Sequence, residues 1–168
     1  ALFSHLFYIS AQVVRFLGLM DYLHPLIRAS KHRLTHFSSP DTLFERYRKK
    51  AAFSYVSDAH LRIMADHLLV PSDQEGYTLA FSKDWECQIY RTMCTLDSAI
   101  WKQLPSLQVP TLIIRADQTN TFFESACRPF KALSPLVEIY TVPNASHLVP
   151  FEYPQKMGDI IRGFLERP

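Results

Sequence analysis

One histidine stands in a segment whose residue types could support proton transfer. His147 lies in the stretch Pro143-Asn-Ala-Ser-His-Leu-Val-Pro-Phe-Glu-Tyr-Pro154, which directly follows a predicted strand over residues 137–142. An imidazole titrates near neutrality, so it can take a proton from a nucleophile and return it to a leaving group. Composition alone leaves open the alternative that His147 is a loop histidine held for structural reasons.

The elements that position His147 lie after Pro105, where the apolar pattern changes from helical spacing to short strand-like runs. The run Thr111-Leu-Ile-Ile114 is continuously apolar and β-branched, which is typical of a strand buried on both faces of a parallel sheet. The predicted order is a strand over 111–114, a helix over 124–133, a strand over 137–142 and a helix that begins at Pro154. This β-α-β-α order implies a right-handed parallel crossover, and open α/β sheets place functional groups at the carboxyl ends of such strands.

The chain before Pro105 has an almost entirely helical pattern. We expect helices over 41–50, from Asp58 to a stop at Pro71, from a Ser82 cap onward and, as a further short helix, up to Leu104, with a loop over 70–77. Apolar residues also recur at intervals of three and four near the start: Leu2, Leu6, Ile9, Val13, Phe16 and Met20. Because Arg15 interrupts this stretch, it predicts a buried helix rather than a membrane span.

Two parallel strands do not make a stable sheet by themselves. Their apolar faces and open edges would remain exposed to water, and such edges invite aggregation. We therefore expect further strands to dock on this segment, through a strand-pairing partner or a homo-oligomer, and we interpret the chain as a fragment. Only 4 glycines occur, whereas a complete α/β enzyme normally uses more at its tight turns.

Composition restricts the classes of function. Hydrophobic residues make up 48% and charged residues 20%, as in ordinary globular proteins, and the net charge of +2 does not favour nucleic-acid binding. The 3 cysteines form no C-x-x-C pair, which predicts a reduced, cytoplasmic protein. Because the apolar start of the chain is interrupted, we expect no membrane partner. His32 and His36 have helical spacing but no third ligand, so we expect no metal, and no cofactor is implied.

The stretch Val109-Pro-Thr-Leu-Ile-Ile-Arg-Ala-Asp117, together with the His147 segment, resembles the end of the α/β-hydrolase superfamily. In that family a "P-T-L-I-I-x-G" strand leads to the catalytic acid, and an "H-x-x-P-x-E-x-P" segment carries the catalytic histidine. Upstream, Arg46-Tyr47 and Trp85-Glu-Cys-Gln-Ile-Tyr90 resemble the family's helical cap. The resemblance implies an α/β fold in which residues 1–104 form cap helices and residues 105–168 form the last β-α-β-α unit, without the N-terminal strands and nucleophile elbow.

The resemblance leaves the identity of the catalytic acid open. The family glycine that ends the strand is Ala116 here, and the positions that match the acid are Thr119 and Asn120. Asn120 can accept a hydrogen bond from an imidazole N–H but cannot stabilise an imidazolium as a carboxylate does. Asp117 could substitute if the loop is rearranged, Glu124 is less favoured because it lies in the following helix, and an acid elsewhere stays possible.

The family nucleophile, a serine in G-x-S-x-G, is not present in the 168 residues. None of Gly18, Gly76, Gly158 and Gly163 begins that motif. The resemblance implies hydrolysis of a small carboxylic ester through an acyl-serine on other sequence, with His147 as general base. The alternative is a non-catalytic scaffold or interaction protein that keeps the fold without the chemistry, and a membrane-associated helical module built on residues 1–20 is a weaker one.

Overall fold

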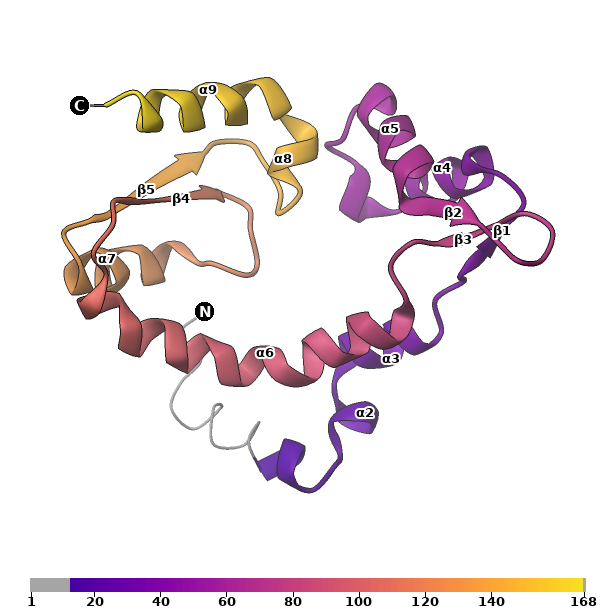
Figure 1. Ribbon diagram of the computed structural model, residues 1–168, viewed down its shortest axis with the longest axis horizontal. Helices are drawn as coiled ribbons and strands as arrows, with labels where there is room; N and C mark the ends of the chain where they lie inside the picture. Colours follow the sequence, from indigo (N-terminus) through magenta and orange to yellow (C-terminus); the bar gives the residue numbers. More distant parts are fainter. Residues whose placement is uncertain (1–12, 168) are drawn as a thin grey trace. The chain divides into compact units, whose positions relative to one another are not determined.

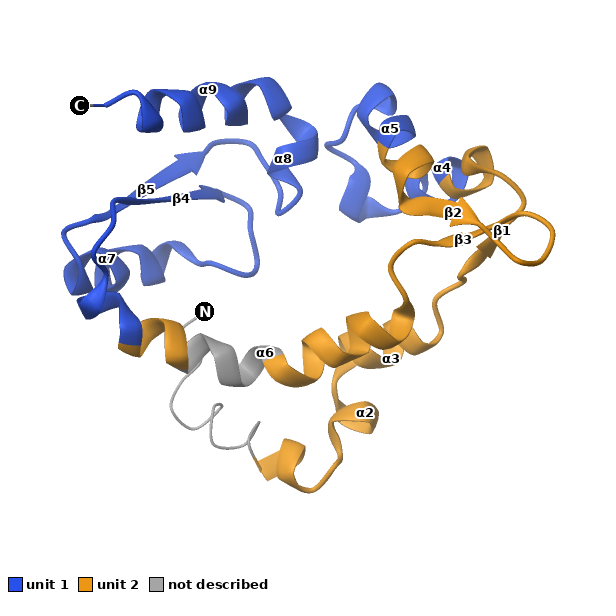
Figure 2. Ribbon diagram, viewed as in Figure 1, with its two compact units in different colours: residues 1, 44–63, 103–168 blue, residues 2–43, 64–102 orange. Residues whose placement is uncertain are grey.

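The computed structural model describes residues 13–167, and for residues 93–98 the backbone alone. The chain forms two compact units, coloured separately in Figure 2. The described residues of the first unit fall within 44–63 and 103–168, and those of the second within 2–43 and 64–102. Residues 44–63 thus group with the C-terminal segment, and the predicted division into a cap (1–104) and a core (105–168) stays a prediction.

The first unit contains a parallel two-stranded sheet. Strand β4 (Thr111–Ala116) pairs with β5 (Val137–Val142) in a register that runs from Thr111 opposite Val137 to Ala116 opposite Val142. Helix α7 (Glu124–Leu133) connects the strands, and α8 (Val149–Glu152) and α9 (Pro154–Leu165) follow them. Helices α7 and α9 lie on opposite sides of the strand pair (Figure 1). The predicted β-α-β-α order is confirmed.

A small apolar core holds the carboxyl ends of the two strands together. Ala116, Val142, Ala145 and Val149 are buried there. The partly buried Ile114, Met157 and Ile160 pack against them, the last two from α9. Each strand therefore ends in a packed layer, which restricts the loops that leave it.

The rest of the first unit is helical. It contains the end of α4 (Pro40–Arg48), the short helix η1 (Ala51–Phe53), the start of α5 (Asp58–Leu68) and, further along the chain, η2 (Leu104–Ser106). The Arg48 guanidinium donates to the carbonyl oxygens of Phe53 and Val56 and to the carboxylate of Asp58. One side chain thereby fixes the connection between α4 and α5.

The second unit combines helices with a small antiparallel sheet. Its elements are α2 (Met20–Leu23), α3 (Pro25–Lys31), β1 (His36–Phe37), β2 (Leu69–Pro71), β3 (Tyr77–Leu79) and most of α6 (Lys83–Gln103). The strand order is β1-β3-β2, and both pairings are antiparallel. Met20, Ile27 and Cys87 form a buried cluster with the partly buried Val14 and Tyr90 packed against it.

Two predictions for this half of the chain are wrong. Residues 70–77 are not only a loop, because they contain the end of β2 and the start of β3, joined by a turn in which Gly76 has a φ of +95°. Strands of three residues are too short to show an alternating pattern. The two helices expected between Ser82 and Leu104 are one continuous helix, α6. Its predicted cap is confirmed, since the Ser82 hydroxyl accepts the backbone N–H of Trp85 at 3.2 Å.

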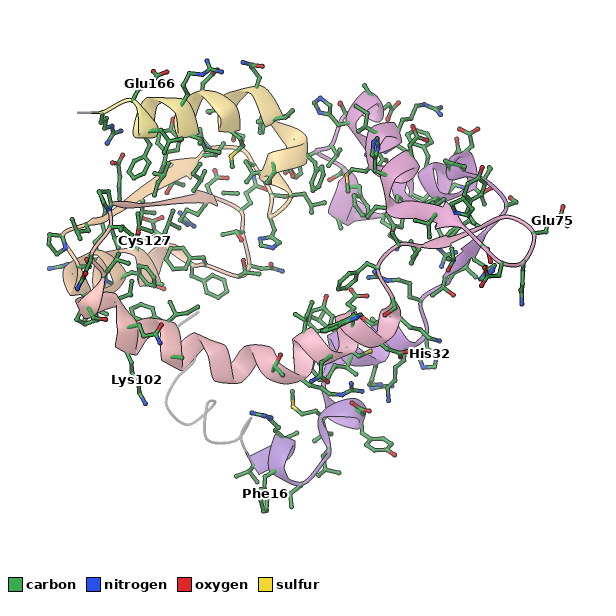
Figure 3. The ribbon with its side chains drawn as sticks, viewed as in Figure 1. Phe16, His32, Glu75, Lys102, Cys127 and Glu166 are labelled. Atoms are coloured by element: carbon green, nitrogen blue, oxygen red, sulfur yellow. The ribbon has the colours of Figure 1, made fainter. Side chains whose placement is uncertain are left out.

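The predicted buried helix near the start is wrong where the structure describes it. Residues 13–16 are helical, but Gly18 takes a φ of +69° and α2 begins afresh at Met20. Met20 is buried, whereas Phe16 is 90% exposed and projects from the ribbon (Figure 3). Leu2, Leu6 and Ile9 lie outside the described residues. Within the part of the chain that is described, no helix has both the length and the apolar character needed to cross a membrane.

Candidate active site

Two loops meet at the carboxyl end of the β4–β5 pair. Because the strands are parallel, the loop after β4 and the loop after β5 leave from the same edge. Backbone hydrogen bonds join them: the Asp117 N–H donates to Val142 O at 3.0 Å, and the Gln118 N–H donates to Ala145 O at 3.2 Å. The second loop carries His147, so the sheet itself brings His147 beside the residues that follow β4.

The imidazole of His147 contacts two threonine hydroxyls. Its Nδ1 atom lies 3.2 Å from Thr119 Oγ1 and 3.1 Å from Thr121 Oγ1. The two hydroxyl oxygens are themselves 3.0 Å apart, so the three polar atoms form a triangle. Thr119 is buried, whereas His147 is exposed. The arrangement fixes the Nδ1 side of the ring and leaves the ring open to solvent elsewhere.

The carboxylate of Asp117 holds the turn after β5. It accepts the backbone N–H groups of Asn144 at 2.9 Å and Ala145 at 3.1 Å. These hydrogen bonds, that of Asn144 first, lower the pKa of Asp117 because they stabilise its charged form. Asn144 has a φ of +53°, a left-handed conformation that asparagine tolerates better than most residues. Asp117 therefore anchors backbone near His147.

The loop after β4 is tied down at its far end by a buried arginine. Arg115, which is 5% exposed, donates from Nε to the carbonyl oxygen of Phe122 at 3.1 Å. Its Nη1 donates to the carboxylate of Glu124 and to Thr141 Oγ1. Arg115 lies on β4 and reaches past the loop that carries both threonines, so the loop is fixed at its start by the sheet and at its end by Arg115.

A buried glutamate holds the turn that carries His147. Glu152, 8% exposed, accepts the backbone N–H of Ser146 at 2.8 Å and also the Ser146 hydroxyl. The Ser146 Oγ in turn accepts the Leu148 N–H at 3.2 Å. Glu152 thus holds Ser146, and Ser146 in turn holds the Leu148 amide on the other side of His147.

None of the three residues considered as the catalytic acid contacts the imidazole of His147 in the structure. Asn120 is exposed, and no hydrogen bond joins it to His147 among the described residues. Asp117 contacts the Asn144 and Ala145 amides and not the imidazole, and Glu124 contacts Arg115. The contact expected of a catalytic acid is made by Thr119, one of the two matched positions, and by Thr121, which lies outside that prediction. The only sequence signal for Thr121 is its hydroxyl, two residues from Thr119.

Polar contacts also occupy His36, which was considered as a metal ligand, and two basic residues near α3. His36 Nε2 lies 2.8 Å from Ser72 Oγ, and no group of three potential metal ligands is found within the described part of the chain. Two of the basic residues near α3 are in ion pairs, Lys31 with Asp21 and Arg33 with Glu86. These contacts are those of a solvated, partly neutralised helix surface.

Solved structures provide the comparison for this geometry. No protein-family model matches the sequence, and no curated protein matches it significantly. E-2-(acetamidomethylene)succinate hydrolase matches 84% of this chain and 51% of its own, with a TM-score of 0.69 and 19% identity. An esterase of Mycobacterium tuberculosis matches 96% of this chain and 50% of its own (0.64, 16%). The peroxisomal alpha-beta-hydrolase Lpx1 of Saccharomyces cerevisiae matches 85% and 40% (0.64, 16%).

These likenesses establish the fold class: the chain has part of an α/β-hydrolase fold. It spans about half the length of the solved structures that it matches. The predicted α/β-hydrolase fold class is thereby confirmed, whereas the expected pairing of this sheet with further strands stays a prediction. At identities of this level the comparison shows the fold alone, and function has to be argued from the site.

Proposed function

We propose that this chain supplies the general base and the helical cap of a hydrolase that cleaves a small carboxylic ester. The observation that carries the proposal is the place and tethering of His147. It stands at the carboxyl end of β5, its ring is exposed, and Nδ1 is held by two hydroxyls. A base held through Nδ1 presents Nε2 to a reacting group, which is the arrangement of a histidine in acyl transfer.

The chemical steps follow from that orientation. A serine on sequence outside these 168 residues would lose its hydroxyl proton to Nε2 of His147 as its oxygen attacks the ester carbonyl. The protonated ring would then return the proton to the departing alkoxide, which leaves an acyl-serine. Water would then lose a proton to the same nitrogen as it attacks the acyl carbon. The bond to the serine oxygen would break, the ring would return the proton to that oxygen, and the carboxylic acid would leave. No cofactor enters this sequence of steps.

The region before residue 105 supports substrate selection. Within the first unit, the Tyr55 hydroxyl donates to Gln118 Oε1 at 2.9 Å, and Gln118 directly precedes Thr119. Tyr55 remains 49% exposed, so its ring is available to contact an acyl or alcohol group. We propose that residues from this part of the chain choose the substrate.

The sheet supports a partner that contributes strands. Among the described residues, β4 and β5 pair only with each other, so each has an edge with unpaired backbone groups. Further strands from the rest of a hydrolase, or from another copy of this chain, would satisfy these groups. Cys87 and Cys127 are free thiols, in keeping with the proposed cytoplasmic location.

The proposal is tested by labelling and by substitution. We expect the complete hydrolase to react with a fluorophosphonate probe, with the added mass on a serine outside these residues. His147→Ala should lower ester turnover by roughly a thousandfold or more, since loss of the base removes the proton-transfer path. Glu166→Gln, which changes an exposed side chain after α9, is the control and should leave turnover unchanged.

The second candidate is a non-catalytic scaffold. One observation favours it: no carboxylate hydrogen-bonds to His147 among the described residues. Under this alternative, the complete protein would take no probe, and His147→Ala would change neither labelling nor turnover. Equal turnover of the His147→Ala protein and the unmodified protein would reject the role we give to the histidine.

A further inference from the structure

Three carboxylates that lie in or beside the two loops are held by other contacts. Asp117 binds two backbone amides, Glu124 binds the buried Arg115, and Glu152 binds Ser146. Each contact fixes one of the two loops, so redirecting a carboxylate toward the imidazole would release the loop that positions it. The acidic groups shape the site without serving the ring directly.

The two hydroxyls that do reach the ring are suited to hold it. A hydroxyl oxygen has lone pairs that can accept the Nδ1–H, and its own hydrogen can turn toward another acceptor. At 3.0 Å, one hydroxyl can donate to the other, so both oxygens can accept from the ring side without two hydrogens meeting. The backbone N–H of Thr121 also points at Thr119 Oγ1, at 3.4 Å. This arrangement satisfies an Nδ1–H with neutral groups only.

We infer that Thr119 and Thr121 together are the positioning residues for His147, holding Nδ1–H in the place where a carboxylate would otherwise stand. The inference rests on the proposed function, because positioning matters only if His147 acts as a base. With the hydrogen fixed on Nδ1, the lone pair lies on Nε2, ready to accept the serine proton. During the proton transfer Nδ1 keeps its hydrogen, and the hydroxyl dipoles face the resulting imidazolium.

Arg115 connects the loop that carries Thr119 and Thr121 to strand β4. Its guanidinium donates a hydrogen bond to the Phe122 carbonyl oxygen and so fixes the loop directly after Thr121. The side chain is buried, so the loop end is fixed by a group that solvent does not compete for. Two neutral hydroxyls on a rigid loop can therefore orient a ring that one mobile hydroxyl could not.

The test reads the position of the ring hydrogen and does not depend on turnover. Nitrogen-15 NMR of the chain at about pH 8.5, well above the ordinary imidazole pKa of about 6.5, distinguishes the two neutral tautomers, and His147→Gln assigns the signal. We expect His147 to carry its hydrogen on Nδ1. The double variant Thr119→Val with Thr121→Val should lose this preference, the Thr→Ser double variant should retain it, and Thr111→Val, at the other end of β4, should leave it unchanged.

Turnover of the complete hydrolase separates this inference from the proposed function. The Val double variant should lower kcat by about ten- to a hundredfold with little change in KM, as expected when a base is misplaced. Hydrogen on Nε2 in the unmodified chain, or an unchanged tautomer in the Val double variant, would overturn the inference. If the NMR results are as expected but His147→Ala leaves turnover unchanged, the proposed function fails while the positioning of the ring stands.

Discussion

The two units use charged side chains in different ways. In the first unit, Arg115 and Glu152 are buried, and each holds one of the two loops at the site, Arg115 through the Phe122 carbonyl oxygen and Glu152 through Ser146. In the second unit, the main cluster of charges is solvent-accessible: Asp21 binds Arg91 and Lys31, with side-chain exposures between 29% and 45%. The first set fixes backbone, whereas the second set braces one helix against another.

This difference indicates where the chain requires a fixed conformation. Burying a charge is costly unless its hydrogen bonds are made, so a buried charge favours the one loop conformation that makes those hydrogen bonds. Exposed ion pairs contribute little and tolerate movement. Large apolar side chains are exposed in both units, among them Phe16 and Tyr22 in the second and Val109 and Leu165 in the first. The difference between the units therefore lies in their buried charges.

The largest expected effect lies in the second unit and concerns backbone rather than charge. A Cβ on Gly76 would lie 2.6 Å from the Phe37 carbonyl oxygen, and its φ of +95° is strained for any other residue. Gly76→Ala should therefore lower the free energy of unfolding by about 2–4 kcal/mol. Chemical denaturation would measure the loss.

Gly158→Ala is the matched control for this prediction. Gly158 lies within α9, and a Cβ there would meet nothing within 4 Å. Alanine should stabilise that helix by roughly 0.5–1 kcal/mol, because it removes the flexibility of glycine. If both substitutions had equal effects, the β2–β3 turn would not have the conformation described.

The second prediction tests whether the buried carboxylate of Glu152 in the first unit holds its loop. Glu152→Gln keeps the shape of the side chain but replaces one acceptor oxygen by an amide that meets the Ser146 N–H or hydroxyl. We expect a loss of about 1–3 kcal/mol, and faster hydrogen exchange at the Ser146 and Leu148 amides. Glu166→Gln, at an exposed position after α9, should change neither quantity. An equally small effect at both positions would mean that the buried carboxylate does not hold the loop.

The contrast between the units also explains how far the sequence could be interpreted. The parallel strands, α7 and α9 were predicted almost to the residue, because buried apolar runs and the proline at 154 give strong local signals. In the second unit, β1, β2 and β3 were missed, since strands of two or three residues have no period of their own. Their pairing depends on contacts between residues far apart in sequence.

The candidate site shows the same limit. His147 was found from its position after a strand and from a motif, both of which are local features. The contacts of Thr119 and Thr121 with Nδ1 depend on the β4–β5 register and on the path of the loop, which residue spacing does not reveal. Asp117 was proposed as an acid because it is near in sequence, but the turn at Asn144 and Ala145 uses both of its oxygens.

As the pH falls, the second unit should lose stability before the loops of the first unit do. Burial lowers the pKa of His24 below the ordinary 6.5, and its Nδ1 has no hydrogen-bond partner among the described residues. The unfolded chain therefore binds this proton first, so the second unit keeps its full stability above pH 6.5 and loses some as the pH falls below that value. Site-resolved hydrogen exchange between about pH 7 and pH 5 would measure the loss.

Asp117 should respond at lower pH. Its pKa is lowered in the folded state, so its contribution is present above the ordinary value of 3.8 and disappears as the pH falls through the folded pKa. The His147 loop should therefore stay protected at pH values where α2 and α3 already loosen. His24→Gln should remove the first transition, and Asp117→Asn the second. Loosening of both units at one pH, in the unmodified chain and in both variants, would contradict this order.

The smallest expected effect tests the exposed charges of the second unit. Arg91 and Lys31 lower the pKa of Asp21, so the carboxylate is charged at neutral pH and attracts both. Because these groups are solvent-accessible, Asp21→Asn should cost at most about 1 kcal/mol, and the difference should vanish near 1 M salt, where screening is strong. Asp159→Asn, which removes a 3.6 Å pair with Arg162 on α9, is the control and should cost less. A loss at Asp21 that persists in high salt would mean that this cluster, like Arg115, fixes backbone, and the contrast between the two units would then be one of degree.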